Sequence, residues 1–122
     1  EGVAMSVGDV LQAMEKDSGI ELHELKVDGG AAASDLLMQM QADILDTTVC
    51  RPTMLETTAW GAAAMAGIGS GVYQSADDVA GHWHLDRQFK PAVDQSHRAA
   101  KLQQWKRAVD SVRGWAREAD IE

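Results

Sequence analysis

The stretch LKVDGGAAASDLLMQMQADIL, from Leu25 to Leu45, decides the fold of this chain. It opens with Leu25 and Val27, whose alternation with polar residues is typical of a short buried strand. An Asp-Gly-Gly turn at 28–30 follows, and the residues from Ser34 to Leu45 have the spacing of an amphipathic helix. The expected apolar face of that helix consists of Leu36, Leu37, Met40, Ile44 and Leu45. Backbone N–H groups stay unpaired at a helix start, and paired glycines let a ligand approach the main chain, so this arrangement is a common device for holding a nucleotide.

The segments on either side of this stretch predict a helix and a second strand. Glu1 to Asp17 has apolar residues at helical spacing, and Ser18-Gly19 ends that helix with Gly19 in the C′ position. Thr48 to Arg51 is a short strand, which Pro52 stops because proline has no N–H to donate. Strand, helix and strand in this order indicate a right-handed βαβ unit with parallel strands.

The rest of the chain is predicted to be mainly helical. Thr57 to Gly67 is dense in alanine and glycine, and we expect this helix to be buried because small side chains let backbones approach closely. Ser75 is an N-cap for a short helix that ends near Trp83, and His84 to Val93 is an extended connector. Gln95 to Arg117 is a long charged helix. Its apolar stripe consists of Leu102, Trp105, Val109, Val112 and Trp115.

The expected fold class is α/β, with a parallel βαβ unit flanked by helices. Two strands make a poor sheet, because parallel sheets are normally wider and are covered on both faces. The chain also begins inside a helix, without an initiator Met or an N-cap, so we expect part of a domain cut from a larger protein. An exposed strand edge leaves N–H and C=O groups unpaired, so we also expect a homo-oligomer or self-association through that edge.

The composition excludes several classes of partner. The chain has 122 residues, with 11 basic and 19 acidic side chains and a formal net charge of -8. Such a chain has no basic field for nucleic acid or an anionic membrane surface, although backbone amides can still bind a nucleotide. No segment approaches the ~20 apolar residues of a membrane span, and the N-terminus lacks a signal-peptide pattern. The single Cys50 suits a reducing compartment, so we expect a soluble, cytoplasmic protein.

The glycine turn at 28–30 has two interpretations when it is taken alone. Adjacent glycines after a strand often mark only a tight turn. The functional interpretation is favoured by position, because open α/β sheets bind ligands beyond the carboxyl ends of their parallel strands. Ser34 stands near the N-cap of the following helix, where its hydroxyl can cap the helix or meet a ligand.

The other candidate residues have simpler interpretations. His82 and His84 could share a metal ion only on an extended segment, and no third ligand is near in sequence, so we predict no metal site. Cys50 lies in a predicted strand without a base partner, and we expect a small buried hydrophobe rather than a nucleophile.

Several motifs together resemble the C-terminal portion of the glycerol kinases of the FGGY carbohydrate kinase family. They are Asp28-Gly29-Gly30-Ala31, the run from Leu37 to Leu45, Arg51-Pro52, Glu56-Thr57-Thr58-Ala59 and Gly61-Ala62-Ala63. The resemblance covers nearly the whole chain and implies part of an actin-like ATPase (ribonuclease H-like) fold. Trp60 departs from the family, which usually has a smaller aliphatic residue there, and Ala64 stands where Tyr is common.

The resemblance also implies an activity: ATP-dependent phosphorylation of glycerol to glycerol 3-phosphate, with Mg²⁺, in a cleft between two actin-like domains. Gly30, beside Gly29, matches a glycine whose backbone lies against the adenine nucleotide. Ser34 matches a position that is usually Asn and contacts the adenine side of the ligand. Because a hydroxyl is shorter than a carboxamide and has fewer donors, this contact is the one most altered here.

The family's catalytic aspartate, glycerol contacts and phosphate loops lie N-terminal to this segment, and no carboxylate here matches them. Residues 1–95 would belong to the C-terminal actin-like domain, and residues 96–122 would form a C-terminal helix packed on it. Phosphoryl transfer needs several converging elements, so we expect the chain to be inactive alone and to reach glycerol only through the N-terminal part. Two alternatives stay open: a kinase for another polyol or sugar, and a non-catalytic actin-like interaction module.

Overall fold

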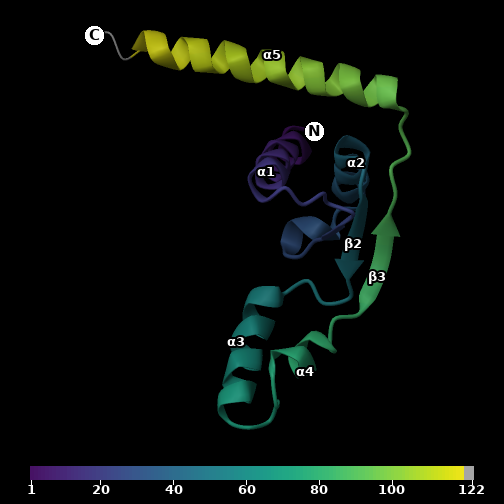
Figure 1. Cartoon of the computed structure of the whole chain (residues 1–122), viewed down its shortest axis with the longest axis vertical. Helices are drawn as coiled ribbons and strands as arrows, with labels where there is room; N and C mark the ends of the chain where they lie inside the picture. Colours follow the sequence, from purple (N-terminus) through teal and green to yellow (C-terminus); the bar gives the residue numbers. More distant parts are fainter. Residues whose placement is uncertain (120–122) are drawn as a thin grey trace.

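The computed structural model describes the backbone of residues 1–119 and the side chains of residues 1–114. A long C-terminal helix runs past two shorter helices at one end of the molecule, and two further helices lie at the opposite end (Figure 1). In chain order the elements are α1 (Gly2–Ser18), β1 (Glu24–Lys26), the 3-10 turn η1 (Gly30–Ala33), α2 (Asp35–Leu45), β2 (Thr48–Pro52), α3 (Thr57–Gly69), α4 (Ala76–Ala80), β3 (Leu85–Phe89) and α5 (Gln95–Ala119).

The sheet contains the predicted parallel pair and one strand that the sequence analysis did not predict. The strand order is β1-β2-β3, with β1 parallel to β2 in the register Leu25 to Val49. The βαβ unit is therefore confirmed. The interpretation of residues 84–93 as a connector is wrong for 85–89, because β3 pairs antiparallel with β2 and places Phe89 opposite Val49. Four of the five β3 side chains are exposed, so the strand lacks the alternation by which half-buried strands are identified.

Most of the predicted helix ends are confirmed. Gly19 follows α1 in the left-handed region at φ 69°, and its N–H donates to the Glu15 carbonyl. The Ser34 hydroxyl caps α2 by accepting from the Leu37 N–H, and Ser75 caps α4 in the same way. The short helix α4 ends at Ala80, before the predicted end near Trp83.

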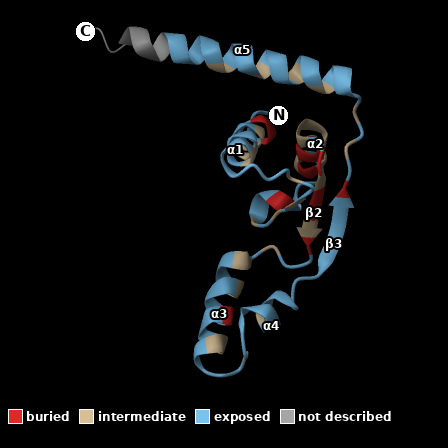
Figure 2. Cartoon of the chain, in the orientation of Figure 1, coloured by how far each residue is buried: buried red, intermediate tan, exposed pale blue. Residues whose placement is uncertain are grey.

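The core lies between α2 and the sheet (Figure 2). Its buried members are Ala32, Met38, Ala42, Val49 and Phe89. The predicted apolar face of α2 is therefore partly wrong, because Leu36 is 67% exposed while Met38 is buried. The helix is covered on two sides, by the sheet at Met38 and by α1 near Ile44, so its buried surface is wider than one stripe.

The predicted burial of α3 is wrong in the part of the chain that the structure describes. Only Ala64 of this helix is buried, and α3 lies beside α4, away from the core (Figure 2). Alanine and glycine permit close packing but do not themselves supply a covering element, which is why the composition alone could not predict burial. Trp60 packs edge-to-face on Tyr73 and His82, with ring centroids 6.2 and 5.7 Å away.

The first half of α5 contacts α1 and α2. The indole Nε1 of Trp105 donates to the Asp9 carboxylate over 2.7 Å, and Arg98 donates to both oxygens of Asp46. The predicted apolar stripe of α5 is partly wrong, because Leu102 and Val112 are exposed. The side chain of Trp115, its last member, and residues 120–122 of the predicted C-terminal helix lie outside the described residues. Within residues 1–119, no helix combines the length and apolar character needed to cross a membrane.

Candidate nucleotide-binding site

The predicted ligand turn lies directly after β1, at the carboxyl end of the parallel pair. Gly29 has φ 78°, in the left-handed region that favours glycine, and the chain then winds into η1 before α2 begins. Two backbone hydrogen bonds close this 3-10 turn: Ala32 N–H donates to the Gly29 carbonyl, and Ser34 N–H donates to the Ala31 carbonyl. The sequence predicted a turn and a helix here, but not the 3-10 turn between them.

Both glycines have free space where a side chain would project. A Cβ atom built on Gly29 or on Gly30 would meet no heavy atom within 4 Å. Gly30 does not have a positive φ, so its lack of a side chain is not required by the backbone. The missing side chain at Gly30 leaves the main chain accessible, as a ligand lying against the backbone requires.

Ser34 is exposed and uses its hydroxyl oxygen to cap α2, at 3.3 Å from the Leu37 nitrogen. Because the hydroxyl accepts in this bond, its own hydrogen stays available as a donor. Capping and ligand contact, which the sequence analysis treated as two separate roles, are therefore compatible at this residue.

The N-terminal end of the turn is fixed to the segment that follows β2. Gly29 N–H donates to the Leu55 carbonyl over 2.9 Å, and the Thr57 hydroxyl donates to the Asp28 carboxylate over 2.7 Å. Sequence reasoning did not find these contacts, since they join residues about 26 to 29 positions apart in the chain.

The C-terminal end of the turn is fixed by Arg51 of β2. Its Nη1 donates to the carbonyls of Ala32 and Ala33, at 3.1 and 3.4 Å, and to the Asp35 carboxylate at 2.7 Å. The hydrogen bond from Arg51, with the positive charge of Arg87, holds the pKa of Asp35 below its ordinary value of 3.8. The sequence analysis used Arg51 only as part of a family motif and assigned it no role.

The remaining candidates lie elsewhere. His82 packs on Trp60 and Tyr73, and within the described residues no group of three His, Cys, Asp or Glu is placed to hold a metal ion. Cys50 is 1% exposed, as expected for a small buried hydrophobe, and burial raises the pKa of its thiol.

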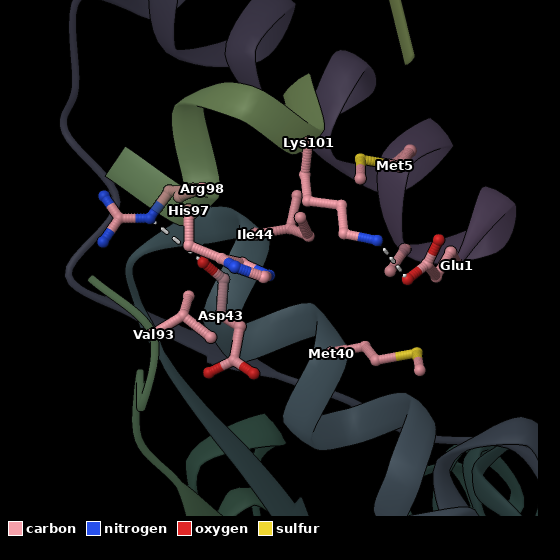
Figure 3. A pocket seen from close by; sticks show the side chains of 10 residues that line it. Glu1, Met5, Met40, Asp43, Ile44, Val93, His97, Arg98 and Lys101 are labelled. Atoms are coloured by element: carbon pink, nitrogen blue, oxygen red, sulfur yellow. Dashed lines mark hydrogen bonds and ion pairs between the residues drawn. The ribbon is translucent and has the colours of Figure 1, made fainter. Parts of the chain in front are cut away.

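A separate cavity of about 190 Å³ lies between α1, α2 and α5 (Figure 3). Its lining is mostly apolar, and among the residues that line it Lys101 pairs with Glu1 while Arg98 donates to the Asp43 carbonyl. The lining residues are Glu1, Ala4, Met5, Met40, Asp43, Ile44, Val93, His97, Arg98 and Lys101. Asp43 and Ile44 follow Ser34 by nine and ten residues, or roughly 14 Å along α2, so this cavity is not part of the ligand turn.

Comparison with known proteins identifies many relatives. Residues 1–70 match the C-terminal domain of the FGGY family of carbohydrate kinases. A glycerol kinase of Aromatoleum aromaticum is 49% identical over 115 residues, covering 94% of this chain and 23% of that protein. A glycerol kinase of Symbiobacterium thermophilum is 52% identical over 118 residues, covering 97% of this chain and 24% of that protein. The chain thus spans about a quarter of the length of these relatives.

Solved structures of kinases also resemble this chain. The glycerol kinase of Plasmodium falciparum, solved with ADP, is 30% identical with a TM-score of 0.73, and the match covers 89% of this chain and 22% of that one. A xylulose kinase of Rhodospirillum rubrum, 23% identical with a TM-score of 0.64, covers 95% of this chain and 23% of that one, and supports the fold alone. The expected fold class, α/β with part of an actin-like ATPase domain, is confirmed. On the evidence of its motifs, its βαβ unit and these matches, the chain belongs to the FGGY family of carbohydrate kinases.

Proposed function

We propose that this chain is the C-terminal segment of an ATP-dependent glycerol kinase and supplies one wall of its adenine-nucleotide pocket. The observation that carries the proposal is the turn at 28–34, which is open above Gly29 and Gly30 and fixed at both ends. Glycerol is favoured over other FGGY substrates because relatives that are about half identical to the chain are named glycerol kinase.

In this proposal the chain binds and orients the nucleotide. The backbone at Gly30 lies against it, and the Ser34 hydroxyl donates to its adenine side while continuing to cap α2. The described residues fit a nucleotide but offer no cluster for Mg²⁺. In the whole enzyme Mg²⁺ would neutralise charge on the transferred phosphoryl group, held by groups outside the described residues.

Titration calorimetry of the 122-residue chain with ADP tests the nucleotide site. We expect saturable binding, which Gly30→Val abolishes by filling the open space above the turn. Gly61→Val is the control, because Gly61 is equally open but lies on α3. Absence of ADP binding by the unmodified chain, or equal binding by Gly30→Val, would contradict the proposed site.

We also propose that the chain is inactive alone, because a wall of the adenine pocket cannot by itself align a phosphate with a hydroxyl. A coupled assay of glycerol-dependent ADP release measures this. Turnover above the buffer blank, persisting through repurification, would refute this part of the proposal.

A cytoplasmic location and self-association of the isolated chain complete the proposal. The buried free thiol of Cys50 suits a reducing compartment. Self-association is supported by exposed apolar side chains on α1 and α3, such as Val10, Met14 and Met65, and by the outer edge of β1, which has no strand partner within residues 1–119. Light scattering after size exclusion measures the mass, and a stable monomer over a wide concentration range would contradict self-association.

A further inference from the structure

We propose that Arg51 is a positioning residue of the nucleotide site, which holds the turn from Gly30 to Ser34 in the shape that receives the ligand. This inference rests on the proposed function. Arg51 donates to the backbone carbonyls of Ala32 and Ala33, so in this proposal it acts through the backbone rather than by contact with the nucleotide.

Arg51 provides hydrogen-bond donors to backbone carbonyls of the turn. The carbonyls of Ala32 and Ala33 stand at the end of a 3-10 turn, where carbonyl groups lack partners within the helix. Arg51 Nη1 donates to both, at 3.1 and 3.4 Å, and its side chain is only 13% exposed. Ser34 is the next residue, so the position of its hydroxyl follows from where these carbonyls are held.

The guanidinium of Arg51 is itself held in place by β3. Its Nε and Nη2 reach the Asp86 carboxylate on β3 at 2.9 and 2.8 Å, and its centre lies 5.3 Å from the Phe89 ring centroid. A planar group anchored on one side presents its remaining N–H groups in a fixed direction, which a lysine ammonium does not do. Arg51 therefore ties the ligand turn to β2 and β3 as one rigid unit, and a preformed turn binds with less loss of entropy.

Arg87 provides a matched control. It donates to the same Asp35 carboxylate over 2.5 Å and lies over the same Phe89 ring at 4.8 Å. It donates to neither Ala32 nor Ala33, and its side chain is 55% exposed. If Arg51 acts only through charge on Asp35, the two arginines should be equivalent; if it positions the turn, only Arg51 should matter.

Amide hydrogen exchange tests the positioning role without requiring a ligand. We expect the Ser34 and Ala32 amides to exchange about tenfold faster in Arg51→Ala, because the turn loses two carbonyl contacts. Arg87→Ala should change them less than about twofold, and amides in the middle of α2 report whether a variant loosens the whole fold. Equal acceleration in both variants, or none in Arg51→Ala, would overturn the inference.

ADP affinity tests the link to function. We expect Arg51→Ala to raise the Kd for ADP about tenfold at a temperature where circular dichroism shows the chain folded, and Arg87→Ala to leave it within about twofold. Arg51→Lys should recover only part of the affinity, and Asp86→Ala, which frees Arg51 without touching the turn, should give an intermediate value. If Arg51→Ala does not fold, Arg51→Lys and Asp86→Ala provide the test of ADP affinity in its place. Wild-type binding with unchanged Arg51 variants would refute this inference, whereas no wild-type binding would refute the proposed function.

Discussion

At the scale of single residues, the Ser34 hydroxyl caps α2 and stays available to the proposed nucleotide site. Its oxygen accepts from Leu37 N–H at the start of α2, while its hydrogen is free for a neighbouring acceptor. An asparagine side chain at the same position also caps a helix well and extends further. If the family position is usually Asn, as the resemblance implies, Ser34 keeps the helix start and would have a shorter reach toward a ligand in the proposed site.

We predict that two substitutions at Ser34 differ in their effects on stability and on ADP binding. Ser34→Ala should lower the free energy of unfolding by about 1 kcal/mol, because the Leu37 amide loses its cap. Ser34→Asn should leave the free energy of unfolding within a few tenths of a kcal/mol and strengthen ADP binding. Urea unfolding and calorimetry measure the two quantities. Weaker ADP binding by Ser34→Asn would count against the adenine contact.

Asp35 should give the chain part of its sensitivity to acid. The hydrogen bond from Arg51 lowers the pKa of Asp35 in the folded state, so its contribution to stability is complete above its ordinary pKa of 3.8. That contribution is lost as the pH falls through the lower folded-state pKa. Asp35→Asn should therefore lose less stability than the wild type between about pH 6 and about pH 2. Urea unfolding at both pH values measures this, and parallel losses would contradict it.

The residues of the candidate site differ in how far they could be predicted from the sequence. Gly29, Gly30 and Ser34 could be selected because a turn after a strand and an N-cap have local signatures. Arg51 could not, because its partners Asp35 and Asp86 are 16 and 35 residues away, and only the pairing of β2 with β3 brings Asp86 beside it.

At the scale of elements, helix ends and strand pairing were predicted correctly where the residues of the segment themselves indicate them. The ends of α1 and α2 follow from Gly19 and Ser34, and the parallel pair follows from the order of strand, helix and strand. β3 was not predicted because its side chains are mostly exposed. The predicted burial of α3 was wrong because small side chains do not indicate which element packs on them.

Two glycines of α3 should respond differently to alanine. Gly61 is open, so Gly61→Ala should stabilise the chain by about 0.5–1 kcal/mol through helix propensity. At Gly67 a Cβ atom would lie 2.5 Å from the Tyr73 ring, which must then leave its place beside Trp60. Gly67→Ala should be about 1–2 kcal/mol less stable than Gly61→Ala. Urea unfolding followed by helical circular dichroism compares them, and equal stabilities would contradict the packing of Tyr73.

At the scale of the whole molecule, α5 is joined to the rest by polar contacts as well as by packing. Arg98 donates to both Asp46 oxygens and to the Asp43 carbonyl, and its side chain is 16% exposed. Lys101 makes a single contact with Glu1 and is 32% exposed. The charged pattern of residues 95–117 predicted a helix here, but these contacts depend on the three-dimensional placement of α1 and α2.

Removal of Arg98 should therefore loosen α5. We expect Arg98→Ala to lower the free energy of unfolding by about 1–2 kcal/mol, since three charge-assisted bonds are lost at a half-buried position. Lys101→Ala, the control, should cost less than about 1 kcal/mol because its pair is exposed. Urea unfolding measures both, and an equal loss would show that Arg98 has no special part in docking α5.

The pairing of β2 with β3 also brings together the two ends of the segment that contains α3 and α4. At these ends the Thr53 N–H donates to the His84 carbonyl over 2.9 Å. A segment closed in this way can open without separating the sheet, so we expect α3 and α4 to open at a lower free energy than the sheet. Leu55 and Thr57 join that segment to Gly29 and Asp28. If the proposed site binds a nucleotide, thermodynamic reciprocity predicts that a nucleotide which stabilises the turn would also make the opening of α3 rarer, and that an ordered α3 would strengthen nucleotide binding to the same degree.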